Sequence, residues 1–164
     1  MTVKYIIGHW TAGNLKPNKK DLSSYQLLVD GNGELHHGMA VGCAASTGGM
    51  NSITYNISCC GGLSTSRLTR IQIEKFYKTC AETLKQFNLP VSAFYTHAEI
   101  GEMCRDKSIN KLLTWNNYLT QNIGKVDLTI LPVDDKNTAM VFTAFTSGDF
   151  IRKKIQWYYN KLNA

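Results

Sequence analysis

The stretch Tyr5-Ile6-Ile7-Gly8-His9-Trp10-Thr11-Ala12-Gly13 decides how the chain is organised. Its first four residues are mostly apolar and β-prone, which predicts a buried strand over residues 3–8. The small residues after Trp10 predict a loop, so we expect His9 at the C-terminal end of the strand. A histidine in this setting is more often a hydrogen-bonded structural residue, but it can also direct a nitrogen lone pair at a metal or a substrate.

The size and charge of the chain set broad limits. The chain has 164 residues, of which 43% are hydrophobic and 18% charged, and we expect it to form a single α/β domain over residues 1–164. A domain of this size buries about 70% of its unfolded surface, so it needs neither a disulfide nor a metal merely to fold. The net charge of +6 makes anionic partners plausible, whether nucleic acid, acidic glycopolymers or membranes, and does not choose among them.

The cysteines and the N-terminus indicate the compartment. Five cysteines, an odd number without C-x-x-C spacing, argue against a disulfide framework or a zinc knuckle and favour a reducing compartment. Residues 1–4 lead straight into the first strand, and we find neither a signal peptide nor an apolar stretch long enough to span a bilayer. We therefore expect synthesis in the cytoplasm, with any export by another route.

Turn and capping residues divide the rest of the chain into alternating strands and helices. In the first half we predict a hairpin from 25–29 and 33–37 around the Asp30-Gly31-Asn32 turn, a loop over 38–50 and a strand over 52–59. A Thr69–Gln72 capping box then predicts a helix from Thr69 to Pro90. In the second half we predict a strand over 91–96, a short helix around 109–119, an extended segment over 126–131 and a C-terminal helix with Asp149 near its start. This mixture predicts a central mixed sheet flanked by helices.

Two of the four histidines have the setting of metal ligands. Catalytic zinc takes three protein ligands and keeps a fourth position for water. His36 and His37 are neighbours in the hairpin and point to opposite faces, so we expect exposed polar residues there. His9 and His97 each terminate a predicted strand, and if those strands are neighbours, both imidazoles meet at one sheet edge. The carboxylate of Asp127 has a similar setting.

Five segments in order carry a wider pattern: 7–13, 24–30 with the 31–33 turn, 51–62, 95–99 and 124–128. Together they resemble the zinc-dependent N-acetylmuramoyl-L-alanine amidases of the phage-lysozyme type, whose superfamily includes the peptidoglycan recognition proteins. The tail 150–158 resembles the closing helix of phage members. No single motif is strong, but the matches span nearly the whole chain. The resemblance implies the amidase/peptidoglycan-recognition-like fold.

The resemblance also implies a catalytic site. His9, His97 and Asp127 fall on the ligands of one Zn²⁺ per chain, and Lys125 falls on the lysine that stabilises the oxyanion. Tyr25 falls on the tyrosine that holds the nucleophile or the tetrahedral intermediate. Zinc lowers the pKa of water to about 7, and the resulting hydroxide attacks the lactyl–L-alanine amide of peptidoglycan.

Three departures from the family pattern bear on this assignment. Twenty-nine residues separate His97 from Asp127, where many members have fewer than ten, and Cys104 or Asp106 in this insertion is an alternative third ligand. Asn56 stands where one branch has a catalytic glutamate, which places the chain with the tyrosine-using branch or makes it a slow enzyme. Gln26 stands where histidine often follows the tyrosine. We assign substrate-binding roles to three further residues: Trp10, Asn56 and Glu99.

We therefore expect a monomeric phage-type endolysin, bacteriolytic and antimicrobial, that reaches the cell wall once the membrane is opened. Its partner is peptidoglycan, with no nucleic acid, and the Arg152-Lys153-Lys154 run is either a solvated helix face or a contact to an anionic envelope. One alternative is a non-catalytic peptidoglycan-binding module or inhibitor. A second is a cysteine-dependent cell-wall amidase, whose thiolate a histidine would activate.

Overall fold

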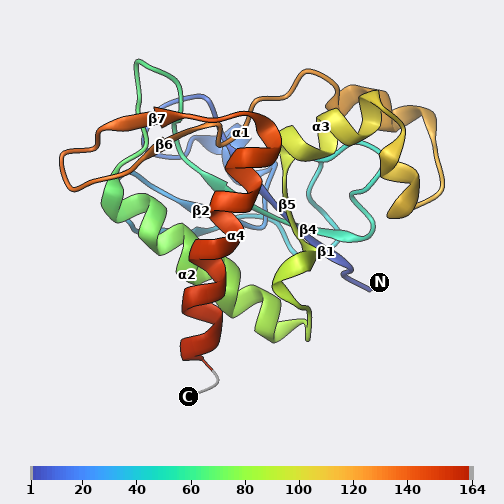
Figure 1. The fold of residues 1–164 in the computed structure, drawn as a ribbon, viewed down its shortest axis with the longest axis horizontal. Helices are drawn as coiled ribbons and strands as arrows, with labels where there is room; N and C mark the ends of the chain where they lie inside the picture. Colours follow the sequence, from blue (N-terminus) through green and yellow to red (C-terminus); the bar gives the residue numbers. More distant parts are fainter. Residues whose placement is uncertain (1, 163–164) are drawn as a thin grey trace.

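A five-stranded mixed sheet forms the centre of the computed structural model, which describes residues 2–162 (Figure 1). The strand order is β3-β2-β4-β1-β5, and every neighbouring pair is parallel except β2–β3. The strands are β1 (Tyr5–Trp10), β2 (Leu27–Val29), β3 (Leu35–His37), β4 (Thr54–Cys59) and β5 (Phe94–Thr96). The sheet and the β2–β3 hairpin confirm the fold class and the turn predicted at residues 30–32.

The alternation of side chains along β1 separates two layers. Ile6 and Trp10 face an apolar cluster formed with the helices α2 (Arg70–Gln86) and α4 (Ala144–Lys161). Ile7 faces a second cluster with α3 (His97–Arg105) and the residues that follow it. His9 lies on the same side of the strand as Ile7. The imidazole therefore points away from the main core, to the side of the sheet that carries the second cluster.

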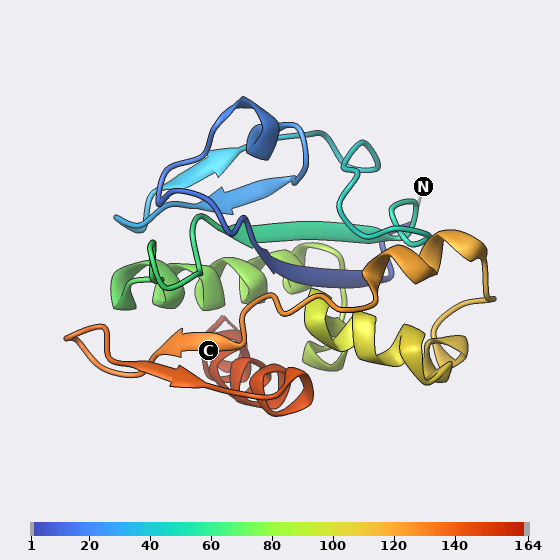
Figure 2. The same ribbon diagram turned by 90° about the horizontal axis from the view of Figure 1, so that it is seen from above.

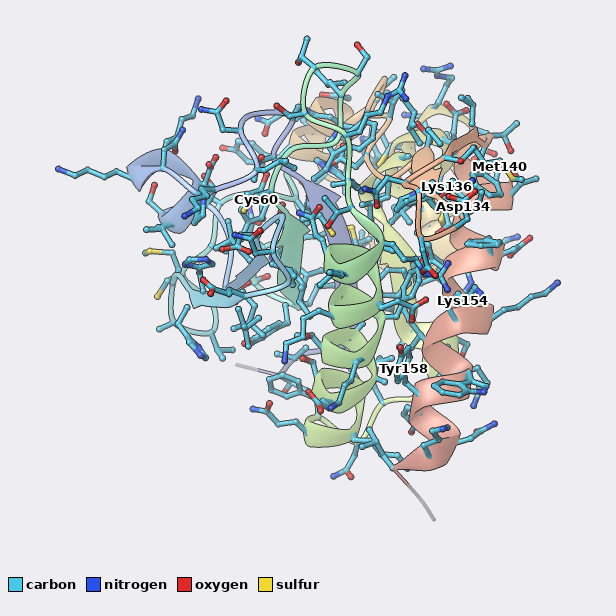
Figure 3. All side chains as sticks on the ribbon, turned by 90° about the vertical axis from the view of Figure 1, so that its left-hand side faces the viewer. Cys60, Asp134, Lys136, Met140, Lys154 and Tyr158 are labelled. Carbon is cyan, nitrogen blue, oxygen red and sulfur yellow. The ribbon has the colours of Figure 1, made fainter. Side chains whose placement is uncertain are left out.

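The helix α2 begins as predicted. Thr69 accepts a hydrogen bond from the backbone N–H of Gln72, and the Gln72 side chain accepts one from the backbone N–H of Thr69. The carboxamide of Gln72 also donates to the carbonyls of Val29 and Cys60, which ties the helix to the sheet. Figure 3 shows Tyr158 of α4 between the two long helices, where its hydroxyl donates to Glu74.

The region from 91 to 122 differs from the prediction. Residues Val91–Ala93 form a 3₁₀ turn, so β5 is short, and His97 is the first residue of α3 instead of a strand terminus. The physical reason is the capping box of Thr96 and Glu99, which starts a helix at this point. The predicted helix over 109–119 is wrong, because the insertion folds as the 3₁₀ turns η2 (Ser108–Lys111) and η3 (Asn117–Asn122).

The predicted extended segment 126–131 is correct only at its end. Leu128 has a φ of 63°, so the chain turns sharply after Asp127 before entering β6 (Ile130–Pro132). This strand pairs with β7 (Ala139–Val141) in a separate two-stranded sheet that the sequence did not indicate. The C-terminal helix starts earlier than predicted, at the Thr143 cap. The structure also contains a short helix, α1 (Lys19–Leu22).

Within residues 2–162, no helix combines the length and the apolar character needed to cross a membrane.

Candidate metal centre

His9, His97 and Asp127 meet in one buried group. The strands β1 and β5 are parallel neighbours, with Gly8 opposite Thr96, so the two histidines lie side by side with ring centroids 4.7 Å apart. The Nδ1 atom of each imidazole lies 3.6 Å from Oδ2 of Asp127. All three residues are at most 6% exposed. The condition on which the sequence argument depended, that the strands leading to His9 and His97 are neighbours, is met.

Hydrogen bonds behind the histidines orient both rings. Nε2 of His9 lies 2.8 Å from Oδ1 of Asn56, and Nε2 of His97 lies 2.8 Å from Oδ1 of Asn122. A carboxamide oxygen only accepts hydrogen bonds, so each Nε2 donates and each Nδ1 keeps its lone pair. Thr47 reinforces this arrangement, since its hydroxyl donates to Oδ1 of Asn56 at 2.8 Å. The tautomer of both rings therefore directs Nδ1 at the centre of the group.

The charges of the group suit a divalent cation. Burial lowers the pKa of His9 below its ordinary value, which keeps the imidazole neutral at neutral pH. Burial alone would raise the pKa of Asp127, because it disfavours the charged carboxylate. The interactions of this carboxylate with the two imidazoles are stronger and hold its pKa below its usual range. Two neutral imidazole nitrogens and one carboxylate oxygen are a donor set typical of catalytic zinc. The residues present therefore fit the metal that the sequence resemblance implies.

The two alternative third ligands lie elsewhere. Cys104 is buried in the apolar cluster that contains Ile7 and Ile109. Asp106 is exposed at the end of α3, where its carboxylate accepts a hydrogen bond from the backbone N–H of Ser108 at 2.8 Å. Neither belongs to the group of metal-ligating side chains that the structure forms around His9.

A pocket of about 450 Å³ opens above this group and is bordered by Tyr25 and Lys125, among others. The ring of Tyr25 lies 5.0 Å from the ring of His9. Burial, with a contribution from Asp127, raises the pKa of Tyr25, so the phenol stays protonated and can donate a hydrogen bond. Lys125 is exposed and lines the same pocket wall as Asp127. The pocket thus combines a proton donor and a cation beside the metal-ligating group.

Two of the predicted substrate-binding residues have other roles. Asn56 is completely buried behind His9, and its backbone and carboxamide are bound by Gln26 and Thr54. Glu99 is 2% exposed, and its carboxylate binds Arg152 through two contacts of 2.8 Å. Neither Asn56 nor Glu99 lines the pocket, so their assignment to substrate binding stays a prediction without support from the geometry of the site.

Trp10 does border the pocket, but its side chain is 5% exposed and packs against Gly62. Sequence reasoning missed Thr47 and Asn122, which lie behind the histidines. Both come from segments without a hydrophobic period, so no pattern in the sequence distinguished them from surface residues.

Part of the chain that forms this site matches a known protein family. The family of N-acetylmuramoyl-L-alanine amidases matches residues 1–108 of the chain. The chain belongs to this family. The match covers the sheet, the hairpin and both histidines of the metal centre, and it ends before Asp127. Membership confirms the resemblance drawn from the sequence segments.

Solved structures share the fold, an amidase among them. The N-acetylmuramoyl-L-alanine amidase LysC from Clostridium intestinale URNW superposes with a TM-score of 0.53 at 14% identity, over 70% of this chain and 88% of that one. PlyL superposes with a TM-score of 0.53 at 18% identity, over 77% of this chain and 87% of that one. At these identities the similarity establishes the fold of this chain. No curated protein matches its sequence.

Proposed function

We propose that the chain is a zinc hydrolase, a single amidase domain over residues 1–164 that cleaves the amide between the lactyl group of N-acetylmuramic acid and L-alanine in peptidoglycan. The observation that carries the proposal is the buried group of His9, His97 and Asp127 at the floor of an open pocket. Family membership supports the choice of substrate.

The residues around the pocket have distinct roles in this reaction. Nδ1 of His9, Nδ1 of His97 and Oδ2 of Asp127 would hold the Zn²⁺, which would supply a Lewis acid and lower the pKa of water. The cation of Lys125 stabilises the negative charge that develops on the carbonyl oxygen of the scissile amide. The protonated hydroxyl of Tyr25 donates a hydrogen bond to the nucleophile or to the tetrahedral intermediate.

A cysteine-dependent mechanism has less support. The cysteines of the chain are free, and all except Cys43 are buried. Burial raises the pKa of the buried thiols, for Cys60 to about 12, so these thiols stay protonated and weakly nucleophilic. The pocket above the histidines is lined by no cysteine among the described residues. Among the described residues, the pocket therefore offers the substrate no thiol nucleophile.

The decisive experiment measures metal content and bond cleavage together. Purified protein should contain one zinc per chain and release L-alanine N-termini from a defined muropeptide, as read by mass. Chelation should abolish the release, and thiol alkylation should not. A protein that sediments with cell wall but releases no L-alanine N-termini would instead be the binding module or inhibitor. Full activity in metal-free protein would end the proposal.

We also infer that the enzyme acts as a monomer and reaches the cell wall once the membrane is opened. There, α4 offers a contact to an anionic envelope. Arg152 is occupied by Glu99 and Asp149, so the contact rests on Lys153, Lys154 and Lys161. Figure 3 shows Lys154 on this helix. Binding to anionic vesicles that weakens with salt and with Lys153→Glu supports the contact, and unchanged binding excludes it.

A further inference from the structure

Another pocket lies between two helices, away from the metal centre. The helices α2 and α4 pack side by side (Figure 2), and a hollow of about 570 Å³ opens between them, which we call the α2–α4 pocket. It is lined by Arg70 and Glu74 of α2 and by five residues of α4 between Phe150 and Tyr158. Its volume is in the range of ligand pockets, roughly 300–1,000 Å³. The pocket shares no lining residue with the pocket above the metal centre, so the proposed hydrolysis does not use it.

The side of the pocket that α4 forms is aromatic. The ring of Trp157 meets the ring of Tyr158 edge to face, with centroids 4.8 Å apart, and Trp157 is 54% exposed. Phe150, two helical turns earlier, packs against Phe142 with centroids 5.1 Å apart. Aromatic rings beside an open hollow are apolar surface that the chain itself leaves uncovered. The pocket thus offers a wall of rings to an apolar group.

The rim of the pocket is cationic. Within residues 2–162, Glu74 is the only acidic residue that lines it, and both oxygens of this carboxylate are occupied. Oε1 of Glu74 lies 2.9 Å from Nη2 of Arg70, and Oε2 accepts a hydrogen bond from the hydroxyl of Tyr158. The ammonium groups of Lys153 and Lys154 have no carboxylate partner in the described part of the chain. These two cations are therefore available to an anion from outside.

The charged and the aromatic features lie next to each other. Nζ of Lys154 lies 5.4 Å from the centre of the ring of Phe150, so a ligand that reaches this ammonium also passes over a ring. A free anion such as inorganic phosphate would pair with the lysines and leave the rings uncovered. An uncharged apolar molecule would cover the rings and leave the lysines without a partner. An amphiphile with an anionic head and an apolar chain satisfies both.

The neighbouring surface favours a lipid over an acidic peptide. Beyond the pocket, Met140 and Val141 of β7 and Phe145 in the first turn of α4 are exposed, Val141 by 76%. Phe142 joins this apolar surface to the ring of Phe150. Exposed apolar side chains beside lysines are typical of surfaces that lie on an anionic bilayer, where the apolar groups enter the lipid and the cations meet the phosphates.

We propose that the α2–α4 pocket binds an anionic phospholipid of the membrane. The phosphate pairs with Lys153 and Lys154, and the start of an acyl chain lies against the rings of Phe150 and Trp157. The proposal rests on the contact between α4 and an anionic envelope that is proposed above. It adds a pocket with an apolar component to the attraction that charge alone provides.

A binding experiment tests the pocket with single lipid molecules. The probe is lysophosphatidylglycerol, which carries one acyl chain and one phosphate charge, titrated into the protein in a calorimeter below its critical micelle concentration. We expect binding to the wild type and at least about fivefold weaker binding to Trp157→Ala and to Lys154→Ala, which lose an apolar and a charged contact respectively. Two controls outside the pocket should bind like the wild type: Gln156→Ala on α4, and Lys78→Ala, which removes an exposed cation of α2.

Three results overturn the proposal. A wild type that does not bind the lysolipid, or that binds an uncharged monoacylglycerol equally well, has no site for an anionic lipid. Equal weakening in Lys78→Ala and Lys154→Ala reduces the effect to net charge. A poly-glutamate peptide that binds more tightly than the lysolipid and displaces it identifies a site for an acidic protein instead.

Vesicles of phosphatidylcholine with phosphatidylglycerol then separate the pocket from the other proposals. Weaker binding of both Lys153→Glu and Trp157→Ala supports the pocket. Weaker binding of Lys153→Glu alone contradicts the pocket and leaves the charged contact of α4 in place, and no binding of the wild type contradicts both. Trp157→Ala should hydrolyse a soluble muropeptide like the wild type, because Trp157 lies outside the pocket of the metal centre. Lipid binding without any hydrolysis contradicts the hydrolase function alone, and hydrolysis without lipid binding contradicts the lipid pocket alone.

Discussion

Nε2 of His97 donates a hydrogen bond to Oδ1 of Asn122, which follows it by 25 residues, at 2.8 Å. The amide nitrogen of Asn122 is occupied as well, since it donates to the carbonyls of Gly48 and Leu119. A carboxamide held at both ends cannot rotate freely, so it fixes the ring that it contacts. The insertion therefore supports the candidate metal centre from behind.

Replacing Asn122 should weaken metal binding. In Asn122→Ala the imidazole of His97 loses the partner that fixes its tautomer and orientation, and changes of this kind typically lower metal affinity 10- to 100-fold. Competition with a chromophoric zinc chelator measures the affinity. Asn116→Ala is the matched control, because Asn116 also ties the insertion to the loop 44–52 but does not touch a histidine. Equal losses in both variants would mean that Asn122 acts only through the fold of the insertion.

The third ligand can be tested by comparing three substitutions. Asp127→Asn should lose most of the bound zinc, because a neutral amide replaces the carboxylate that faces both histidines. Cys104→Ser and Asp106→Asn should retain one zinc per chain, since their side chains lie away from the group. Metal content by elemental analysis is the measurement. Zinc loss in either insertion variant, with Asp127→Asn unaffected, would move the ligand into the insertion.

The elements that the sequence predicted are those with strong local signals. The Thr69–Gln72 capping box, the turn after Asp30 and the apolar strand before His9 each specify their structure over a few residues. The approach of His9 to His97 could be expected only on the condition that their strands are neighbours, because sequence does not give strand order. The structure supplies that condition.

The start of α3 was missed although its signal is local, because the capping box of Thr96 and Glu99 outweighs the β-prone residues before it. The turn before β6, in contrast, depended on tertiary contacts. The turn after Asp127 requires a positive φ at Leu128, which is rare for a leucine. Its side chain is buried against the open face of Gly8, and its carbonyl accepts a hydrogen bond from Ser147. Only the folded chain brings these residues together, so no local pattern could indicate the turn.

Lys125 should affect turnover and leave the metal in place. Its exposed cation lines the pocket beside Asp127, and the loss of one donor to a developing oxyanion costs on the order of 100-fold or more in kcat. Lys125→Ala should therefore keep one zinc and a native circular dichroism spectrum while its turnover on a soluble muropeptide falls. Lys136→Ala, far along the chain in an exposed turn, is the control. Turnover like that of the wild type would remove Lys125 from the mechanism.

Asp30 should contribute stability that depends on pH. Burial disfavours its charged form, but His36 and the backbone N–H groups of Glu34 and Asn32 outweigh this and hold the pKa of Asp30 below its ordinary value. A carboxyl with a depressed pKa in the folded state stabilises the fold above its unfolded pKa of about 3.9 and loses this contribution as the pH falls through the folded value. The difference in unfolding free energy between the wild type and Asp30→Asn should therefore shrink as the pH falls from about 5 toward 3. A difference that stays constant down to pH 3 would contradict this account.

The last prediction concerns the ion pair that joins α4 to the helix α3, which begins at His97. Glu99 is 2% exposed, and both of its carboxylate oxygens contact the guanidinium of Arg152 at 2.8 Å. Gly148 leaves the room for this contact, because a Cβ atom there would lie 2.1 Å from the carboxylate. Burial opposes the charge of Arg152, but Glu99 and Asp149 outweigh it and raise the pKa of Arg152 above its ordinary value. The guanidinium of Arg152 is thus held in its charged form.

Removing Arg152 leaves the carboxylate of Glu99 buried without its partner, which typically destabilises a fold by about 3–5 kcal/mol. Arg152→Ala should lower the free energy of unfolding by this order, as measured by urea denaturation. Asp149→Ala removes only the exposed partner of the same guanidinium and should cost at most about 1 kcal/mol. The double variant Glu99→Ala/Arg152→Ala should be destabilised less than the sum of its single variants, because the two side chains share one interaction. Additive effects would show that each side chain acts through its own packing, and the link between α4 and α3 would then not be electrostatic.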